Sequence, residues 1–143
     1  MPDSSIDVMN RLLTVLYRSL PMYLNEASPW TEAKDVRAQA ALDRLIADRQ
    51  QDCRRVAAWI MDHYGAIELG EFPMEFTDLH FLSLDFLIKE LIGYQVQDVA
   101  AIENCAARLA RDPAALALAQ EILGSERAHL ELLEELVQQP AAT

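Results

Sequence analysis

The sequence is poor in residues that interrupt helices. It contains only four glycines and six prolines among 143 residues, and the prolines fall mostly between periodic hydrophobic segments. Ala, Leu, Glu and Arg, all strong helix formers, dominate the composition. A chain of this length usually forms one domain. We therefore predict a single all-helical domain over residues 1–143.

The sequence also lacks a basic cluster, since Arg54-Arg55 is no more than a pair and the net charge is -11. An acidic surface repels phosphate backbones and anionic membranes, so we expect neither nucleic acid nor a membrane as partner. No apolar run reaches the ~18 residues that suggest a membrane span. The first seven residues have no basic segment typical of a signal peptide. We expect a cytoplasmic protein.

Several chemistry-bearing motifs are missing. The two cysteines, Cys53 and Cys105, lie inside helical patterns and form no CxxC motif, which predicts buried free thiols. There is no Gly-rich phosphate loop, no Ser/His/Asp order and no Cys/His nucleophile pair. Hydrolase and nucleotide chemistry therefore have no support in the sequence.

The hydrophobic period predicts four helices, at about residues 5–26, 31–64, 77–111 and 113–138. Pro21 should kink or end the first helix, and Gly65 should stop the second in the C′ position. Asp112 and Pro113 are typical first residues of the fourth. The segment Ala66–Phe76, roughly 11–12 residues, could reach near 40 Å when extended. That length would make helices two and three parallel, as in ferritin-like bundles, although a plain up-down bundle stays possible.

Two polar residues lie on the apolar stripe of the fourth helix. Glu126 is one turn after Ile122 and one turn before Leu130, and His129 follows Glu126 by three residues. A buried carboxylate is costly without a partner. Glu-x-x-His on a bundle helix is half of a carboxylate di-metal site, and its ligands suit iron, manganese or zinc. The alternative is a solvated pair at the rim between helices.

The second and third helices carry further candidates. Glu90 lies in the apolar block of the third helix, where it either faces inward or reaches solvent beside Lys89, and Asp85 and Asp98 are rivals on other faces. The stripe of the second helix passes through Arg49 and Asp52, with Asp48 beside them. Arginine is rarely buried unpaired, so an inward Arg49 is the unusual feature of this helix.

The chain resembles the ferritin-like superfamily, with bacterioferritin as the nearest type. The residues that carry the resemblance are Met9–Leu13 through Tyr23 to Trp30 in the first helix, and Glu121-Ile122-Leu123 followed by Glu126 to His129 in the last. It implies Glu126, His129 and Glu90 as metal ligands, with Asp52, or Asp48 after a one-residue slip, as a fourth. Where the family has its first-helix Glu stands Leu16, and its first Glu-x-x-His falls near Arg49 and Asp52.

The resemblance thus leaves two outcomes for the core. Either Glu90, Glu126, His129 and Asp52 bind one ion, iron or another divalent metal, or Arg49 occupies the centre as a permanent cation paired with Glu126, Asp52 or Glu90. We favour the second, because a buried guanidinium suits a carboxylate pair and repels metal.

For function, this outcome predicts a degenerate ferritin-like protein acting as a non-catalytic structural or interaction module. The alternatives are a metal (iron) binding protein or oxidoreductase with a reduced site, and a binder of small apolar ligands. Trp30, Trp59 and the apolar block Leu79–Ile92 offer more apolar surface than a monomeric bundle comfortably hides. Together with the resemblance, they predict a homodimer through the first two helices. The sequence indicates no particular protein partner.

Overall fold

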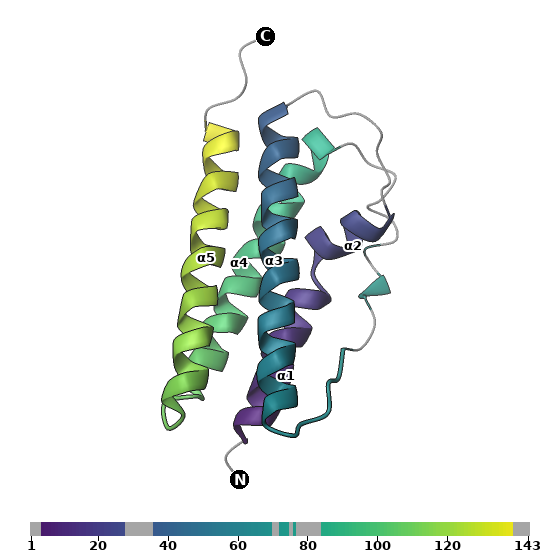
Figure 1. Ribbon diagram of the computed structural model, residues 1–143. Helices are drawn as coiled ribbons and strands as arrows, with labels where there is room; N and C mark the ends of the chain where they lie inside the picture. The colour runs from purple at the N-terminus through teal and green to yellow at the C-terminus, as the bar shows by residue number, and fades with distance from the viewer. Residues whose placement is uncertain (1–3, 28–35, 70–71, 75, 77–83, 139–143) are drawn as a thin grey trace.

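The computed structural model describes residues 4–69, 72–74, 76 and 84–138, except for 28–35 (Figure 1). Within these ranges the chain forms five helices and no strand, which confirms the all-helical prediction. The helices are α1 (Ser5–Tyr17), α2 (Leu20–Ala27), α3 (Val36–Asp62), α4 (Leu84–Ala107) and α5 (Pro113–Gln138). Among the described helices, none combines the length and the hydropathy that crossing a bilayer requires.

The four long helices, α1, α3, α4 and α5, lie side by side (Figure 1). Both α3 and α4 pack against α1 and α5, and the short α2 packs against α3 and α4. In Figure 1, α3 and α4 run downward while α1 and α5 run upward. The two central helices of the chain are therefore parallel, which is the arrangement that the long connection was expected to allow. The predicted starts of these helices at Thr31 and Thr77 lie outside the described residues.

The first predicted helix is two helices in the structure. The ring of a proline inside a helix clashes with the carbonyl four residues earlier, which for Pro21 belongs to Tyr17. Helix α1 ends at Tyr17, and α2 begins at Leu20. Pro21 thereby falls in the first turn of α2, where a missing N–H costs nothing. The buried Ser19 hydroxyl donates to the Leu16 carbonyl at 2.8 Å and satisfies a polar group at the break.

The end of α3 corrects the prediction for Gly65. Tyr64, not Gly65, is the left-handed residue, with φ 62°. Its N–H donates to the Met61 carbonyl at 3.0 Å, and the Gly65 N–H donates to the Ile60 carbonyl at 2.8 Å, which is a Schellman motif. Gly65 serves packing instead, because a Cβ there would lie 2.7 Å from Cγ2 of Ile6.

Replacing Tyr64 by glycine is expected to stabilise the protein. A left-handed non-glycine residue costs about 1–2 kcal/mol, and the side chain is 97% exposed and contributes little burial. After the higher unfolded-state entropy of glycine is subtracted, Tyr64→Gly should exceed Tyr64→Ala by about 0.5–1 kcal/mol in urea unfolding. Tyr64→Ala is the matched control, because it removes the ring but keeps the strained Cβ. Equal stability of the two variants would contradict this account.

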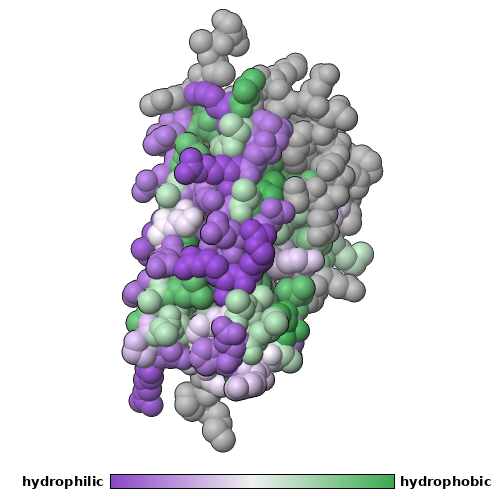
Figure 2. Space-filling view, viewed as in Figure 1, coloured by the Kyte–Doolittle hydropathy of each residue, from purple (hydrophilic) through white to green (hydrophobic). Residues whose placement is uncertain are grey.

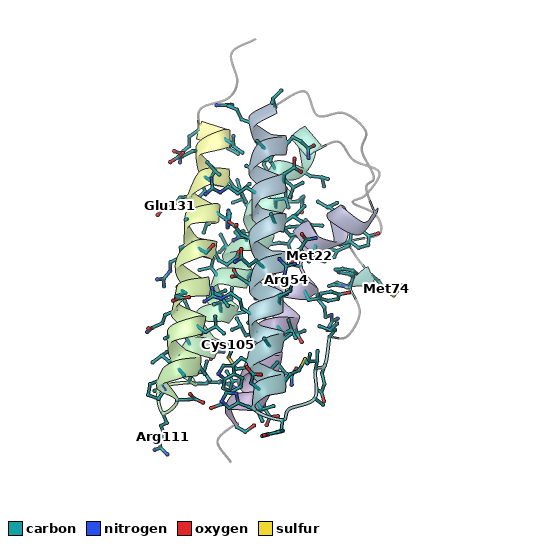
Figure 3. All side chains as sticks on the ribbon, in the orientation of Figure 1. Met22, Arg54, Met74, Cys105, Arg111 and Glu131 are labelled. Carbon is teal, nitrogen blue, oxygen red and sulfur yellow. The ribbon has the colours of Figure 1, made fainter. Side chains whose placement is uncertain are left out.

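The start of α5 is as predicted. Asp112 caps the helix, since its Oδ1 accepts from the Ala115 N–H at 3.2 Å, and Pro113 is the first helical residue. Both cysteines are free, with Cys105 buried between the helices and Cys53 half-buried (Figure 3). Burial raises the pKa of the Cys53 thiol to about 11. The described cysteines are therefore packing residues at neutral pH.

The hydrophobic core consists of two clusters, one above the other. The cluster around α1 contains Met9, Leu12, Leu16, Val56, Ile60, Val99, Ile102, Ala119 and Ile122 among others. The cluster around α2 contains Leu20, Leu24, Leu42, Leu45, Leu87, Leu91 and Leu133 among others. Each cluster draws residues from α3, α4 and α5, so these three helices pass from one to the other. Between the two clusters, the buried side chains of α3, α4 and α5 are polar.

Candidate polar site in the bundle core

Buried polar side chains separate the two hydrophobic clusters. Arg49 on α3, Gln95 on α4 and Glu126 on α5 each lie between residues of one cluster and residues of the other along their helix. All three side chains are at most 1% exposed. Buried polar groups are tolerated when they are hydrogen-bonded to one another. We refer to these three residues with Asp98, Asp52 and His129 as the polar layer.

Arg49 is the centre of the polar layer and is completely buried. Its Nε donates to both carboxylate oxygens of Glu126 at 3.1 Å, and its Nη2 donates to Oε2 of Glu126 at 2.8 Å. The same Nη2 donates to Oε1 of Gln95 at 2.6 Å. Nη1 donates to Oδ2 of Asp98 at 3.1 Å. The guanidinium thus joins α3 to both α4 and α5, in the fork geometry that suits carboxylates.

Gln95 closes this network from α4. While its Oε1 accepts from Arg49, its Nε2 donates to Oε2 of Glu126 at 2.7 Å and to the Glu126 carbonyl at 3.0 Å. Gln95 was not among the residues predicted from the sequence, and Asp98 was expected only as a rival of Glu90. A signal was available in the spacing, because Gln95 follows the core residue Leu91 by one turn. The prediction was restricted to carboxylates and histidine, which are the usual metal ligands, and so it left out a neutral amide.

Glu90 does not join the polar layer. Its side chain is exposed, as is that of its neighbour Lys89, so the prediction of an inward Glu90 is wrong and the solvent alternative holds. At about 100° per residue, Glu90 and Gln95 point about 140° apart around α4. Leu87 and Leu91 occupy the core face of that part of the helix. The carboxylate that α4 supplies to Arg49 is Asp98 instead.

His129 is the member of the polar layer at the seam between α3 and α5. The side chain is nearly buried, and its Nε2 is 2.8 Å from Oδ2 of the more exposed Asp48. Glu126 and His129, one helical turn apart, therefore turn to different partners on α3, Arg49 and Asp48. The predicted Glu-x-x-His pair faces the interior, but the structure does not join its two side chains at one point.

Asp52 is the least well compensated member of the layer. The residue is 7% exposed, and its nearest cation is Nη1 of Arg55 at 3.7 Å. Burial, reinforced by the negative charge of Glu126, raises the pKa of Asp52 from its ordinary value to about 6, against the opposing effect of Arg55. Asp52 therefore changes charge close to neutral pH while the folded structure holds it in place.

The charges around Arg49 keep it protonated. Burial lowers the pKa of the guanidinium, but the carboxylates of Glu126 and Asp98 raise it by more, so the net shift is upward. Burial also raises the pKa of Asp98, and the contact with Arg49 offsets this only in part. The centre of the layer is therefore a permanent cation between carboxylates. The guanidinium does not release its proton at neutral pH.

The residues present do not fit a di-metal centre. Both oxygens of Glu126 already accept from a guanidinium, and Leu16 packs in the α1 cluster where the resemblance implies a Glu. In the part of the chain that the structure describes, no three His, Cys, Asp or Glu side chains are grouped as a metal ion requires. A fixed cation about 4 Å away would also repel a divalent ion.

Comparisons with known proteins add no family to this picture. No family model matches the chain, and no curated protein or solved structure shows significant similarity to it.

Proposed function

We propose that this protein is a ferritin-like bundle in which a buried arginine replaces the metal, and that it acts as a non-catalytic structural or interaction module. The observation that carries the proposal is Arg49, completely buried between Glu126 and Asp98. A guanidinium in this place neutralises the inward carboxylates that a metal ion would otherwise neutralise.

The helix arrangement supports the ferritin-like part of the proposal. Parallel α3 and α4, each packed against α1 and α5, match a bundle with one long crossover in its middle (Figure 1). The polar layer lies between the two hydrophobic clusters, a position in which bundles of this kind build their metal sites from facing helices. The retained Glu126 and His129 are consistent with descent from such a site. A homodimer in the cytoplasm completes the proposal.

The hydrogen bonding of the layer supports a structural role over a catalytic one. Every nitrogen of the Arg49 guanidinium donates to a side chain of α4 or α5. A catalytic metal centre keeps an open position for substrate or water, whereas this cation has its donors engaged within the fold. Arg49, Gln95 and Glu126 can therefore hold three helices together while all three side chains stay at most 1% exposed.

Metal content tests the proposal. We expect the purified protein, after incubation with ferrous iron or zinc and desalting, to hold well under one metal ion per chain by elemental analysis. We also expect no oxygen consumption above buffer after ferrous iron is added. The physical reason is that the guanidinium occupies the carboxylates and repels the ion.

The alternative function, metal binding by a reduced site, predicts the opposite result. It would rely on His129, whose imidazole is not engaged by Arg49 and contacts Asp48 instead. One tightly held ion per chain, lost in His129→Ala but kept in the control His63→Ala, would refute the proposal in favour of this alternative. His63 is a suitable control because it is exposed and stacks on Trp59 instead of entering the layer.

A further inference from the structure

A groove runs along the surface between the first half of α3 and the second half of α5. Its volume is about 420 Å³, and its walls include the small residues Ala40 and Ala41 on α3 and the leucines Leu132 and Leu136 on α5. It continues past Ala128 and Ser125 toward the Asp48–His129 pair. The alanine side chains are too small to fill this part of the seam, so apolar surface stays open to solvent.

The two rims of this α3–α5 groove carry opposite charge. Arg44 lines it from the α3 side and Glu135 from the α5 side, and both border the two parts of the groove. The α3 carboxylate at its far end, Asp48, is already engaged by His129. Arg37 adds a second cation on α3, and Glu131, at the outer edge of α5, a second carboxylate (Figure 3). Figure 2 shows this face, where hydrophilic side chains predominate and hydrophobic ones lie in gaps between them. An apolar floor with a charged rim is typical of protein–protein interfaces.

We propose that a second copy of this chain occupies the α3–α5 groove, with the two-fold axis parallel to the helices. Charge complementarity favours a second copy as the partner, because a groove with one basic and one acidic rim is complementary to itself. A two-fold interface places the same patch on both subunits. The chain supplies both charges at the same height of the bundle, since Arg44 and Glu135 line the same part of the groove.

The direction of the axis follows from the charges. An axis running across the helices would place α3 on α3, so that Arg44 would face Arg44 of the second copy. An axis parallel to the helices places each α3 over the α5 of the other copy, and each Arg44 then faces Glu135. Only the second arrangement pairs opposite charges, twice by symmetry. It also covers Leu132 and Val36, which are 36% and 77% exposed.

This interface differs from the one that the resemblance implies. The homodimer in the proposed function was expected through the first two predicted helices, whereas the α3–α5 groove uses the second and the last. The inference does not depend on the polar layer being free of metal. A chain that binds one metal ion tightly could still form this dimer, and a metal-free chain could be a monomer. The two proposals can therefore be refuted independently.

Mixing two charge-reversed variants tests the proposal. Sedimentation velocity at about 10–100 µM should show wild-type protein as a dimer. Arg44→Glu alone and Glu135→Arg alone should each weaken self-association roughly tenfold or more, since each creates two like-charge contacts across the axis. An equimolar mixture should regain the wild-type dimer. In the mixed dimer the two reversed side chains face each other, and so do the two unchanged ones, which restores opposite charge at both contacts.

The control is Glu90→Arg, which makes the same charge change at an exposed position of α4. It should dimerise as the wild type does, and the melting temperatures of all variants should show that they are folded. Three results would overturn the proposal: a monomeric wild type, a mixture that stays monomeric, or equal weakening by Glu90→Arg. A monomeric wild type would leave the groove to a different occupant.

Discussion

Replacing Arg49 by methionine is expected to lower the free energy of unfolding by about 3–5 kcal/mol, the usual cost of removing one partner of a buried ion pair. Methionine fills much of the same volume, so the loss is electrostatic more than steric. Glu126 would stay fully buried with only Gln95 to donate to it. Urea unfolding at pH 7.5 with circular dichroism measures the change.

Two comparisons separate the charge from the packing. The cost of Arg49→Met should shrink at acidic pH, where a carboxyl without its cation can take up a proton. The double variant Arg49→Met with Glu126→Leu should be more stable than Arg49→Met alone, because no buried charge is then left unpaired. A cost below about 1 kcal/mol for Arg49→Met would show that Glu126 finds solvent or another cation, contrary to the structure.

Replacing Asp52 by asparagine is expected to stabilise the protein by about 2 kcal/mol at pH 7.5 and by almost nothing at pH 4. Burial raises the pKa of Asp52 from 3.8 to about 6. Between these values the folded protein binds a proton that the unfolded chain releases, so wild-type stability falls as pH rises through 6. The full shift, which already includes the opposing effect of Arg55, corresponds to about 3 kcal/mol. Solvent screening beside the exposed Arg55 lowers the expected effect to about 2 kcal/mol.

The measurement is the free energy of unfolding at half-unit steps from pH 4 to 7.5 for both proteins. The difference between Asp52→Asn and wild type should open between pH 4 and 6 and then stay level. Asp43→Asn is the matched control, since Asp43 lies on the same helix but is exposed. Parallel profiles for wild type and Asp52→Asn across the whole range would rule out a buried Asp52 that titrates near 6.

The start of α5 and the central charge pair could be read from the sequence because each depends on local pattern. Asp112 followed by proline starts a helix whatever packs against it. Arg49 and Glu126 stood out because each interrupts a hydrophobic stripe of otherwise consistent phase. The length of one connection favoured the parallel direction of α3 and α4 but left an up-down bundle open. In each case, one local feature of the sequence favoured one structure over the alternatives.

Glu90 and Gln95 show where the sequence was insufficient. The segment around them is apolar on nearly every side, so its hydrophobic pattern does not fix which face turns inward. Gln95 and Asp98 face the core because both bind Arg49, from which they are 46 and 49 positions away in the sequence. Contacts between such distant residues are absent from any local window.

The left-handed conformation of Tyr64 could not be predicted from the sequence. Glycine is the preferred left-handed residue after a helix, but Gly65 is required one position later because Ile6 lies against its α-carbon. Helix α3 therefore accepts a strained tyrosine in exchange for close packing with α1. The inward position of Asp52 was predicted from the stripe of α3, but its raised pKa also depends on Glu126 of α5, which no feature of α3 indicates. Tertiary packing overrode the local preference at Tyr64.

The polar layer also fixes the axial alignment of the bundle. The guanidinium of Arg49 meets α4 and α5 at a single height, through Gln95, Asp98 and Glu126. Leucine-rich stripes alone tolerate sliding by one helical turn, about 5.4 Å, since leucine then replaces leucine. With the layer in place, the same slide would bury Arg49 and Glu126 separately in hydrocarbon. The polar residues, whose burial costs the most free energy, thus exclude an alignment shifted by one helical turn.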